Sequence, residues 1–513
     1  MQIFLQFLCS YATLRVWFYI MLNGGDGVLK NYEVGSFFDE MMEETGAPKT
    51  HYQWFHQLIG QFSDQELKEK HETAQLNFLR QGITFTVYNH TGGTERTMPF
   101  DFVPIIIPKQ QWKKVEKGIK QRISALNHFL EDVYHEQRIV EAGIIPRELI
   151  ENNPYYYNKQ IGGVNIPLNN HVFLAGVDLI RDENGEYRVL EDNLRNPSGM
   201  SYVFQNRYVM RQVYPELFFQ HSIETLEHQL SELHNAVISH VPKNADPHKT
   251  PTAVLLTPGM YNSAYYDHVF LAQQMGIELV EGRDLIVKDD VVYMKTIRGL
   301  KRVDIIYRRI DDDFLDPEAF RPDSVLGVSG LLRAYKKGNV SILNGIGNGV
   351  ADDKAMYVYV PDMIRFYLDE EPIIPNVETY FLSDPEKLEY VLENLEELVV
   401  KNVGASGGYD MLIGPQSDED LRNEFRRKII EKPHQYIAQP TIKLSRAPAY
   451  QDGRFYPCHV DLRVFAMSGD YTNVLPGGLS RVALKEGSLV VNSSQGGGGK
   501  DTWILSEGGQ SNA

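Results

Sequence analysis

Cysteine is almost absent from this sequence. Its 513 residues include two cysteines, Cys9 and Cys458, near opposite ends of the chain. That spacing excludes a disulfide scaffold and any zinc or iron–sulfur site built on cysteine. A chain of this length needs neither disulfides nor metal sites for stability, because it can bury several hydrophobic cores. The low cysteine content suits a reducing compartment, and we therefore expect a cytoplasmic protein.

Positive charge is also scarce. Lysine and arginine number 51 against 68 aspartates and glutamates, which gives a net charge of −17. An acidic chain without a long basic run is a poor candidate for binding nucleic acids or anionic membranes. We expect neither partner. A polyanion such as a nucleotide would have to be held by a local cluster of positive groups.

Long apolar runs are missing except at the start of the chain. Residues 1–22 are nearly all apolar, but Arg15 interrupts them and no small-residue cleavage site follows. This pattern favours neither a signal peptide nor a membrane span. We interpret residues 1–29 as a poorly ordered leader, with Met21 a candidate for the real first residue. A membrane anchor is the alternative.

The remainder divides into three regions. Residues 30–245 are mainly helical, and apolar spacing predicts helices over 53–80 and 110–140. After a Pro-rich linker, residues 246–345 alternate strands with helices, which predicts a small α/β unit with a parallel sheet. Residues 346–513 combine helices, glycine-rich turns and many strands. The chain as a whole therefore belongs to the α/β class, with lobes of α+β character.

Three oxygen-bearing side chains share a predicted hairpin at 172–192, whose turn is marked by an Asn-Gly pair at 184–185. Glu191 and Asn193 point to one face of the second strand, and strand pairing brings Asp178 opposite them. Such hard oxygen ligands suit Mg²⁺. The alternative is a solvated acidic strand face.

A lysine followed by a glycine-rich loop forms a second candidate site. Lys401 ends a predicted strand, and the loop after it supplies Gly404, Ser406, Gly407 and Gly408. Backbone N–H groups of such a loop can surround phosphates while the ammonium group meets their charge. The residue order differs from a Walker A motif. A flexible hairpin loop is the alternative.

Three other basic residues are candidates for phosphate contacts. Lys354 begins a predicted helix, a position that the helix dipole does not favour for a cation. Arg463 and Arg481 lie within apolar β-rich runs, and arginine can bind phosphate or carboxylate through two bonds. A surface lysine and a structural ion pair between Arg463 and Asp461 are the respective alternatives.

Mixed charges also mark a strand end in the α/β unit, where residues 308–313 read RRIDDD. Ligands bind at the carboxyl ends of strands in open sheets, so this run is a candidate substrate contact. An ordinary cluster of ion pairs is the favoured alternative.

The order Lys354, Lys401 with its glycine-rich loop, then Gln439 in YIAQPTI resembles the nucleotide half of an ATP-grasp enzyme. The resemblance implies that both lysines contact phosphates, that the loop closes over them, and that Gln439 meets the adenine amino edge. An acid followed by an E-x-N motif, here Asp178 and then Glu191, is similar to the magnesium end of that fold.

The acids precede the lysines, which reverses the ordinary order and resembles the circularly permuted ATP-grasp proteins, among them glutathionylspermidine synthetase. The type 2 permuted group is the most similar. The phrases LEDNLRNPSGMSY, NGIGNGVADDKAMY and PGGLSRVALKEGSLVVNSSQGGG carry the resemblance, which runs from about residue 30 to 505. It implies a metal-binding half within 30–245, a Rossmann-like pre-ATP-grasp unit at 246–345 and a nucleotide-binding lobe at 346–513.

The function implied by this resemblance is an ATP- and Mg²⁺-dependent carboxylate–amine ligase that forms an acyl phosphate and releases ADP and phosphate. Its substrates would be small molecules or peptides. Arg463 and Arg481 would neutralise the transferred phosphoryl group. A non-catalytic nucleotide-binding partner subunit and a small-molecule kinase are the alternatives. Asp410 departs from the pattern, because relatives typically carry glycine there, and an acid near the phosphate loop could weaken nucleotide binding.

Overall fold

The computed structural model describes residues 29, 32–89, 92–404, 410–484, 488, 491 and 497–506. Residues 1–28, the bulk of the predicted leader, lie outside this part, so the leader stays a prediction. Within the described residues, no helix combines the length and the apolar character needed to cross a membrane.

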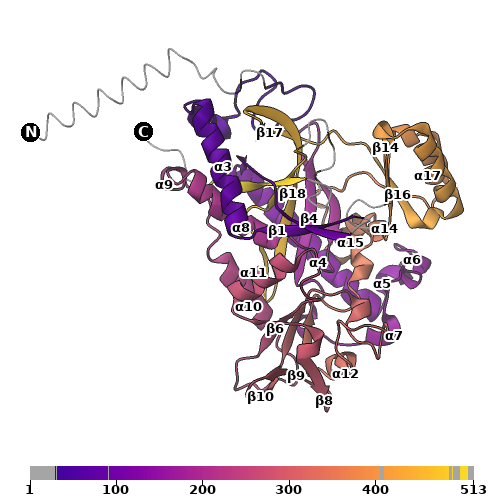
Figure 1. Ribbon diagram of the computed structural model, residues 1–513. Helices are drawn as coiled ribbons and strands as arrows, with labels where there is room; N and C mark the ends of the chain where they lie inside the picture. Colours follow the sequence, from indigo (N-terminus) through magenta and orange to yellow (C-terminus); the bar gives the residue numbers. More distant parts are fainter. Residues whose placement is uncertain are drawn as a thin grey trace, which may run out of the picture.

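A large sheet occupies the centre of the molecule (Figure 1). Its neighbouring strands run in the order β3 (Phe100–Ile107), β21 (Gly498–Ile504), β20 (Leu479–Val482), β18 (Arg454–Ser468), β4 (Leu174–Arg181) and β5 (Tyr187–Asn193). Two further strands, β17 (Arg446–Gln451) and β19 (Thr472–Val474), also pair with β18. The sheet therefore joins segments that are far apart in the sequence.

Both faces of the large sheet are covered. Along β3, Ile105 and Ile107 belong to one hydrophobic core, while Ile106 belongs to the other. The helix α4 (Lys109–Tyr134) packs in the first core, and α8 (Met200–Val213) packs in the second. Because successive side chains of a strand point to opposite faces, a strand buried on both sides becomes a continuous apolar run.

The predicted hairpin is confirmed. Strands β4 and β5 are antiparallel and are joined by the turn that contains Gly185, whose φ of 76° suits glycine. The register places Asp178 opposite Glu191 and Gly176 opposite Asn193, with an irregularity after Asp178.

A smaller parallel sheet confirms the predicted α/β unit. Its strands run in the order β12 (Ser341–Leu343), β11 (Ile305–Arg308), β6 (Ala253–Leu256) and β7 (Glu278–Val280). The helices of this unit are α11 (Tyr265–Met275) and α12 (Leu331–Lys336). Next to it lies an antiparallel meander that we did not predict, made of β8 (Leu285–Lys288), β9 (Val291–Thr296) and β10 (Gly299–Arg302).

A separate small lobe carries β14 and β16 and lies to one side of the large sheet in Figure 1. Its antiparallel strands run in the order β13 (Tyr380–Phe381), β16 (Tyr436–Pro440), β14 (Leu398–Asn402) and β15 (Met411–Ile413). Two helices, α16 (Pro385–Glu393) and α17 (Glu419–Glu431), contribute to its core. Leu398 and Val400 belong to that core, so Lys401 points to the opposite face.

Two predicted helices are interrupted. The helix expected over 53–80 is divided into α2 (Gln53–Ile59) and α3 (Asp64–Arg80). Ser63 caps α3, since its Oγ accepts the Glu66 N–H at 3.3 Å and the Glu66 carboxylate accepts the Ser63 N–H at 2.8 Å. The helix expected over 110–140 is α4, followed after a short break by α5 (Arg138–Glu141).

The segment before the small lobe consists of three short helices, α13 (Gly349–Asp352), α14 (Lys354–Tyr357) and α15 (Val360–Leu368). The other elements with more than three residues are peripheral to the site: α6 (Arg147–Glu151), α7 (Asn158–Ile161), α9 (Leu217–Gln220), α10 (Gln229–Ile238), β1 (Thr84–Asn89) and β2 (Gly92–Thr97). The fold as a whole is mixed α/β, as predicted.

Candidate active site

The three predicted metal ligands lie together at the edge of the large sheet. Glu191 and Asn193 share one face of β5, and Asp178 faces Glu191 from β4. The Asp178 side chain is buried, whereas those of Glu191 and Asn193 are partly exposed. The hairpin therefore brings two carboxylates and one amide to a single place.

Two arginines hold the carboxylate of Asp178. Arg463 donates from Nε to Oδ1 at 2.6 Å and from Nη2 to Oδ2 at 2.8 Å, and Arg481 donates from Nη2 to Oδ2 at 2.9 Å. Burial acts to raise the pKa of Asp178, but the two guanidinium groups outweigh it and lower the pKa to about 2. Asp178 is thus ionised and already paired at neutral pH.

The structural ion pair considered for Arg463 has a different partner. The register places Arg463 opposite Asp178, and it places Asp461 opposite Arg481. Asp461 accepts from Arg481 Nε at 2.8 Å. The pairing of Arg463 with Asp461 is therefore wrong, because the neighbouring strands supply closer partners than the residue two positions away.

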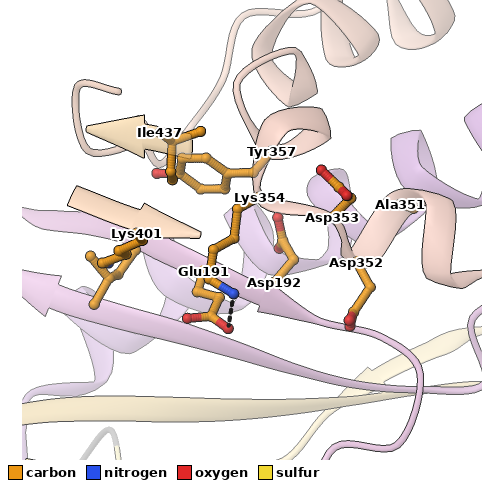
Figure 2. A pocket seen from close by; sticks show the side chains of 10 residues that line it. Glu191, Asp192, Ala351, Asp352, Asp353, Lys354, Tyr357, Lys401 and Ile437 are labelled. Carbon is orange, nitrogen blue, oxygen red and sulfur yellow. Dashed lines mark ion pairs between the residues drawn. The ribbon is translucent and has the colours of Figure 1, made fainter. Parts of the chain in front are cut away.

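Lys354 joins the acid end to the lysine end. It begins α14, which Asp353 caps by accepting the Ala355 N–H at 2.8 Å. The Lys354 ammonium lies 3.6 Å from Oε1 of Glu191, and Figure 2 shows the two side chains pointing toward one another. Lys401 lines the same small pocket.

Lys401 is oriented by a neighbouring amide. Its Nζ donates to Oε1 of Gln439 at 2.8 Å, and Nε2 of Gln439 donates to Thr379 Oγ1 at 2.9 Å. Burial, assisted by the charge of Lys354, lowers the pKa of Lys401 to about 8, although Glu191 opposes the shift. The adenine contact predicted for Gln439 stays a prediction, while its amide has a clear role beside Lys401.

The glycine-rich loop is described only at its start. Gly404 is exposed and borders the cleft, while Ser406, Gly407 and Gly408 lie outside the described residues. Asp410 follows the loop with a φ of 50°, a left-handed conformation in which glycine is less strained. Its carboxylate accepts from Asn402 Nδ2 at 3.0 Å and lies 3.2 Å from Nζ of Lys428.

One cleft of about 510 Å³ contains most of the predicted site. Both ends of the site contribute to its lining: Glu191, Asn193, Lys354, Gly404, Arg463 and Arg481. Asp178 binds the arginines at its edge, and Lys401 lies in the pocket that Glu191 and Lys354 share. The other wall of the cleft is formed by residues that follow strands β6 and β11 of the small parallel sheet.

Comparison with known proteins agrees with this geometry. Residues 104–483 match the family described as circularly permuted ATP-grasp type 2. The chain belongs to this family. The resemblance inferred from the motifs is therefore confirmed, and so is the permuted ATP-grasp fold.

Relatives of this permuted ATP-grasp chain share most of its length. An uncharacterized protein of Synechocystis sp. is 48% identical over 479 residues, which cover 93% of this chain and 98% of that protein. An uncharacterized protein of Mycobacterium tuberculosis is 47% identical over 470 residues, covering 91% and 84%. A Frankia casuarinae protein, provisionally named glutamate–cysteine ligase 2-2, is 40% identical, and the match covers 91% of this chain but 53% of that protein.

A solved structure supports the fold independently. The apo form of a glutathione synthetase-like effector from Globodera pallida matches with a TM-score of 0.55 over 87% of this chain and 98% of the effector. The two sequences are 12% identical, so the likeness concerns the fold alone.

The donor set of the ATP-grasp cleft fits a hard divalent cation. Among the described residues, no three His, Cys, Asp or Glu side chains are grouped to hold a metal ion. Glu191 and Asn193 would therefore act with phosphate oxygens and with Asp178, which also binds two arginines. Nδ2 of Asn193 is buried and lacks a hydrogen-bond partner, so the protein does not fix this amide. Carboxylate, amide and phosphate oxygens are ligands that suit Mg²⁺.

Sequence reasoning missed one residue that supports the cleft floor. Arg195 donates from Nε to Oδ2 of Asp352 at 2.8 Å, and its guanidinium lies 4.3 Å from the ring centre of Tyr155. It therefore ties the strand that carries the predicted metal ligands to the helix before Lys354. Its place two residues after Asn193, within the quoted motif, was the signal that could have found it.

The RRIDDD run divides into two roles. Arg308 is buried and lies 3.1 Å from Asp312, so the ion-pair alternative holds for this residue. Arg309 borders the cleft and donates to the carbonyl oxygen of Pro197 at 2.8 Å and to Ser198 Oγ at 2.9 Å. Arg309 therefore holds the loop that follows the predicted metal ligands.

Proposed function

We propose that this protein is an ATP- and Mg²⁺-dependent carboxylate–amine ligase. The observation that carries the proposal is the 3.6 Å approach of Lys354 to Glu191, residues that belong to the phosphate end and the metal end of the site. A nucleotide whose phosphates bind both a lysine and a metal ion requires this proximity.

The two lysines would hold the phosphates of ATP. Lys401 has a pKa of about 8, which reflects a desolvated ammonium group without a full counter-charge. A phosphate oxygen beside it would supply that charge and keep the lysine protonated. Gln439 would serve this step by fixing the position of the Lys401 side chain.

The metal end would complete the nucleotide site. Glu191, Asn193 and Asp178 would hold Mg²⁺, which neutralises phosphate charge when it is bound. Asp178 also orients both arginines, so the same carboxylate would set the positions of the metal and of the groups that meet the transferred phosphoryl group.

Arg463 and Arg481 would stabilise the charge that develops during transfer. A carboxylate oxygen of the acid substrate attacks the γ-phosphorus, the bond to ADP breaks, and an acyl phosphate forms. An amine then attacks the acyl carbon, phosphate leaves, and the amine loses a proton as the amide forms. This sequence needs no serine or cysteine nucleophile.

The ligase class is supported by family membership and, at a coarse level, by the name of the Frankia relative. The chain spans about half the length of that relative. A second candidate is a nucleotide-binding partner of a separate catalytic module, since the Frankia protein continues beyond the matched segment.

The two candidates differ in nucleotide turnover. The full chain is incubated with ATP, Mg²⁺ and a cell metabolite extract, nucleotides are separated by chromatography, and products are identified by mass spectrometry. The ligase produces ADP and an amide only when an acid and an amine are both present. AMP with pyrophosphate would contradict an acyl phosphate, a phosphorylated product without amine would indicate a kinase, and ATP binding without turnover would favour the partner role.

A further inference from the structure

The small parallel sheet contains a crevice whose position follows from its strand order. The chain leaves β6 toward β7 on one side and leaves β11 toward β12 on the other, although β6 and β11 are neighbours. Ligands of open α/β sheets bind outside the carboxyl ends of strands at such a reversal. The residues after these two strands, including Pro258 and Ile310, border the large cleft.

A buried histidine presents a donor to this crevice. His268 lies in α11, is 1% exposed and borders the cleft. Its Nδ1 lies 2.9 Å from Thr257 Oγ1, which accepts the N–H of Gly259 at 3.2 Å. The threonine hydroxyl can therefore donate to Nδ1, which leaves the proton of the neutral ring on Nε2.

The surroundings keep the ring neutral, and the acids of this region, Asp267 and Asp311, have partners within the protein. Asp311, which lines the cleft after β11, accepts from Asn196 Nδ2 at 2.8 Å. Burial, reinforced by Arg309, lowers the pKa of His268 well below its ordinary value. The one acid between Thr257 and His268 is Asp267, which is buried, accepts the Ser201 N–H at 2.9 Å and lies 3.4 Å from Nη2 of Arg309. Its charge is thus directed away from a ligand.

Asn262 offers a further donor at this wall. Oδ1 of Asn262 accepts the Ala264 N–H at 2.9 Å, so its Nδ2 is left for a ligand. The α11 helix begins at Tyr265 beside these residues, and no side chain caps it. The Tyr265 N–H already donates to the Asn262 carbonyl oxygen at 3.0 Å, so it is the next N–H groups and the helix dipole that favour a negative group at this end.

We propose that this crevice binds a carboxylate of the acid substrate, with Nε2–H of His268 as a specificity-determining donor. The inference rests on the proposed ligase function and adds the place and charge of its second substrate. Arg309 connects this subsite to the metal end, because it binds the Pro197 carbonyl oxygen and Ser198 Oγ in the loop after Asn193.

Binding at the crevice can be tested without turnover. The full chain carrying ¹⁵N-labelled histidine is titrated with formate, acetate, glutarate and L-glutamate, and His268 is assigned with the His268→Gln variant. We expect at least one carboxylate to shift the Nε2 resonance saturably. Glutaramide, the neutral diamide matched to glutarate, should leave it unchanged. A His268 resonance that ignores all four carboxylates, or that responds equally to glutaramide, would overturn the inference.

Kinetics provide the second test once an acid substrate is known. His268→Ala should raise the KM for the acid roughly tenfold to a hundredfold, as expected for the loss of a hydrogen bond to a charged group, and should change kcat little. His268→Gln, which keeps an amide donor, should restore part of the loss. Unchanged KM for the acid in His268→Ala would refute the subsite.

A matched control separates recognition from folding. His240 is equally buried but packs edge to face with Phe173 and hydrogen bonds to the Ala236 carbonyl oxygen, outside the cleft. His240→Gln should lower stability and leave the KM for the acid unchanged; an equal rise in KM would show that His268 acts through folding alone. Absence of any nucleotide turnover in the wild type would defeat the proposed function, whereas the titration would still report on the crevice.

Discussion

The acid end and the lysine end of the cleft are stabilised in opposite ways. At the acid end, the large sheet buries Asp178 among guanidinium groups that satisfy its charge before any ligand arrives. At the lysine end, a small lobe holds Lys401 with a neutral amide as its hydrogen-bond partner, and its pKa is lowered to about 8. The carboxylate at the acid end is thus paired without any ligand, whereas in the proposed function a phosphate supplies the counter-charge of Lys401.

The largest expected effect concerns the stability of the acid end. Arg481→Met leaves Asp461 and Asp178 buried with a lost partner, so we expect a loss of about 3 to 5 kcal/mol in the free energy of unfolding. Urea unfolding of the full chain measures it. Arg365→Met removes an exposed pair with Glu371 and should cost less than about 1 kcal/mol. Equal losses of stability in Arg481→Met and Arg365→Met would show that the buried ion pairs contribute no more than an exposed one.

Turnover should depend most on the carboxylate of Glu191, which lies between the acid end and Lys354. Glu191→Gln keeps the volume but loses the charge that meets Lys354 and the metal, so kcat should fall roughly a hundredfold to a thousandfold while some nucleotide binding remains. ADP release measures this change. Glu186→Gln, at the exposed turn of the same hairpin, is the control that should leave kcat unchanged. Normal turnover in Glu191→Gln would remove Glu191 from the metal site.

Substitution of Lys401 should change the affinity for MgATP and its dependence on pH. Lys401→Met should weaken MgATP binding roughly tenfold to a hundredfold, because a hydrogen bond between charged groups is lost. A lysine with a pKa of about 8 is charged below that pH, so wild-type affinity should fall as pH rises through 8. The variant should lack this fall. Calorimetry from pH 7 to pH 9 measures the MgATP affinity of the wild type and of Lys401→Met, with Lys387→Met in α16 as the control. If the affinity of Lys401→Met fell with pH as steeply as that of the wild type, another group would be responsible for the pH dependence.

The smallest expected effect concerns Asp410. Its carboxylate is held by Asn402 and lies near Lys428, and its backbone has the positive φ that glycine adopts without strain. Asp410→Gly loses the contacts of the carboxylate but removes the strain of a positive φ at a residue other than glycine. The free energy of unfolding should therefore change by less than about 1 kcal/mol. MgATP affinity should change by less than about threefold. A large gain in affinity would show that Asp410 repels the phosphates.

Local signals in the sequence were sufficient for the acid end. The Asn-Gly turn at 184–185 set the hairpin, and alternation along its strands placed Asp178, Glu191 and Asn193 on one side. The partners of Asp178 could not be found in this way, because Arg463 lies 285 positions away and meets it only through strand order in the large sheet.

Weak turn signals explain the features that were missed. The meander at 285–302 turns at Asp289 and Asp290, whose φ values of 51° and 57° are unusual for residues other than glycine. The break before α3 could have been predicted, because Ser63 and Glu66 form a capping box at the start of that helix. The prediction of one continuous helix relied on apolar spacing alone. The role proposed for His268 depends on a hydrogen bond to Thr257, which no spacing rule predicts.

The central claim is that both ends bind one nucleotide through a shared metal ion. A double-mutant cycle of Glu191→Gln and Lys401→Met, measured as ATP affinity by calorimetry, tests it most directly. With Mg²⁺ present, we predict that the two losses are non-additive, with a coupling of about 1 to 3 kcal/mol. With the metal chelated, the coupling should fall to the part that comes from the direct attraction between Glu191 and Lys401. Additive losses under both conditions would contradict a single metal–nucleotide site.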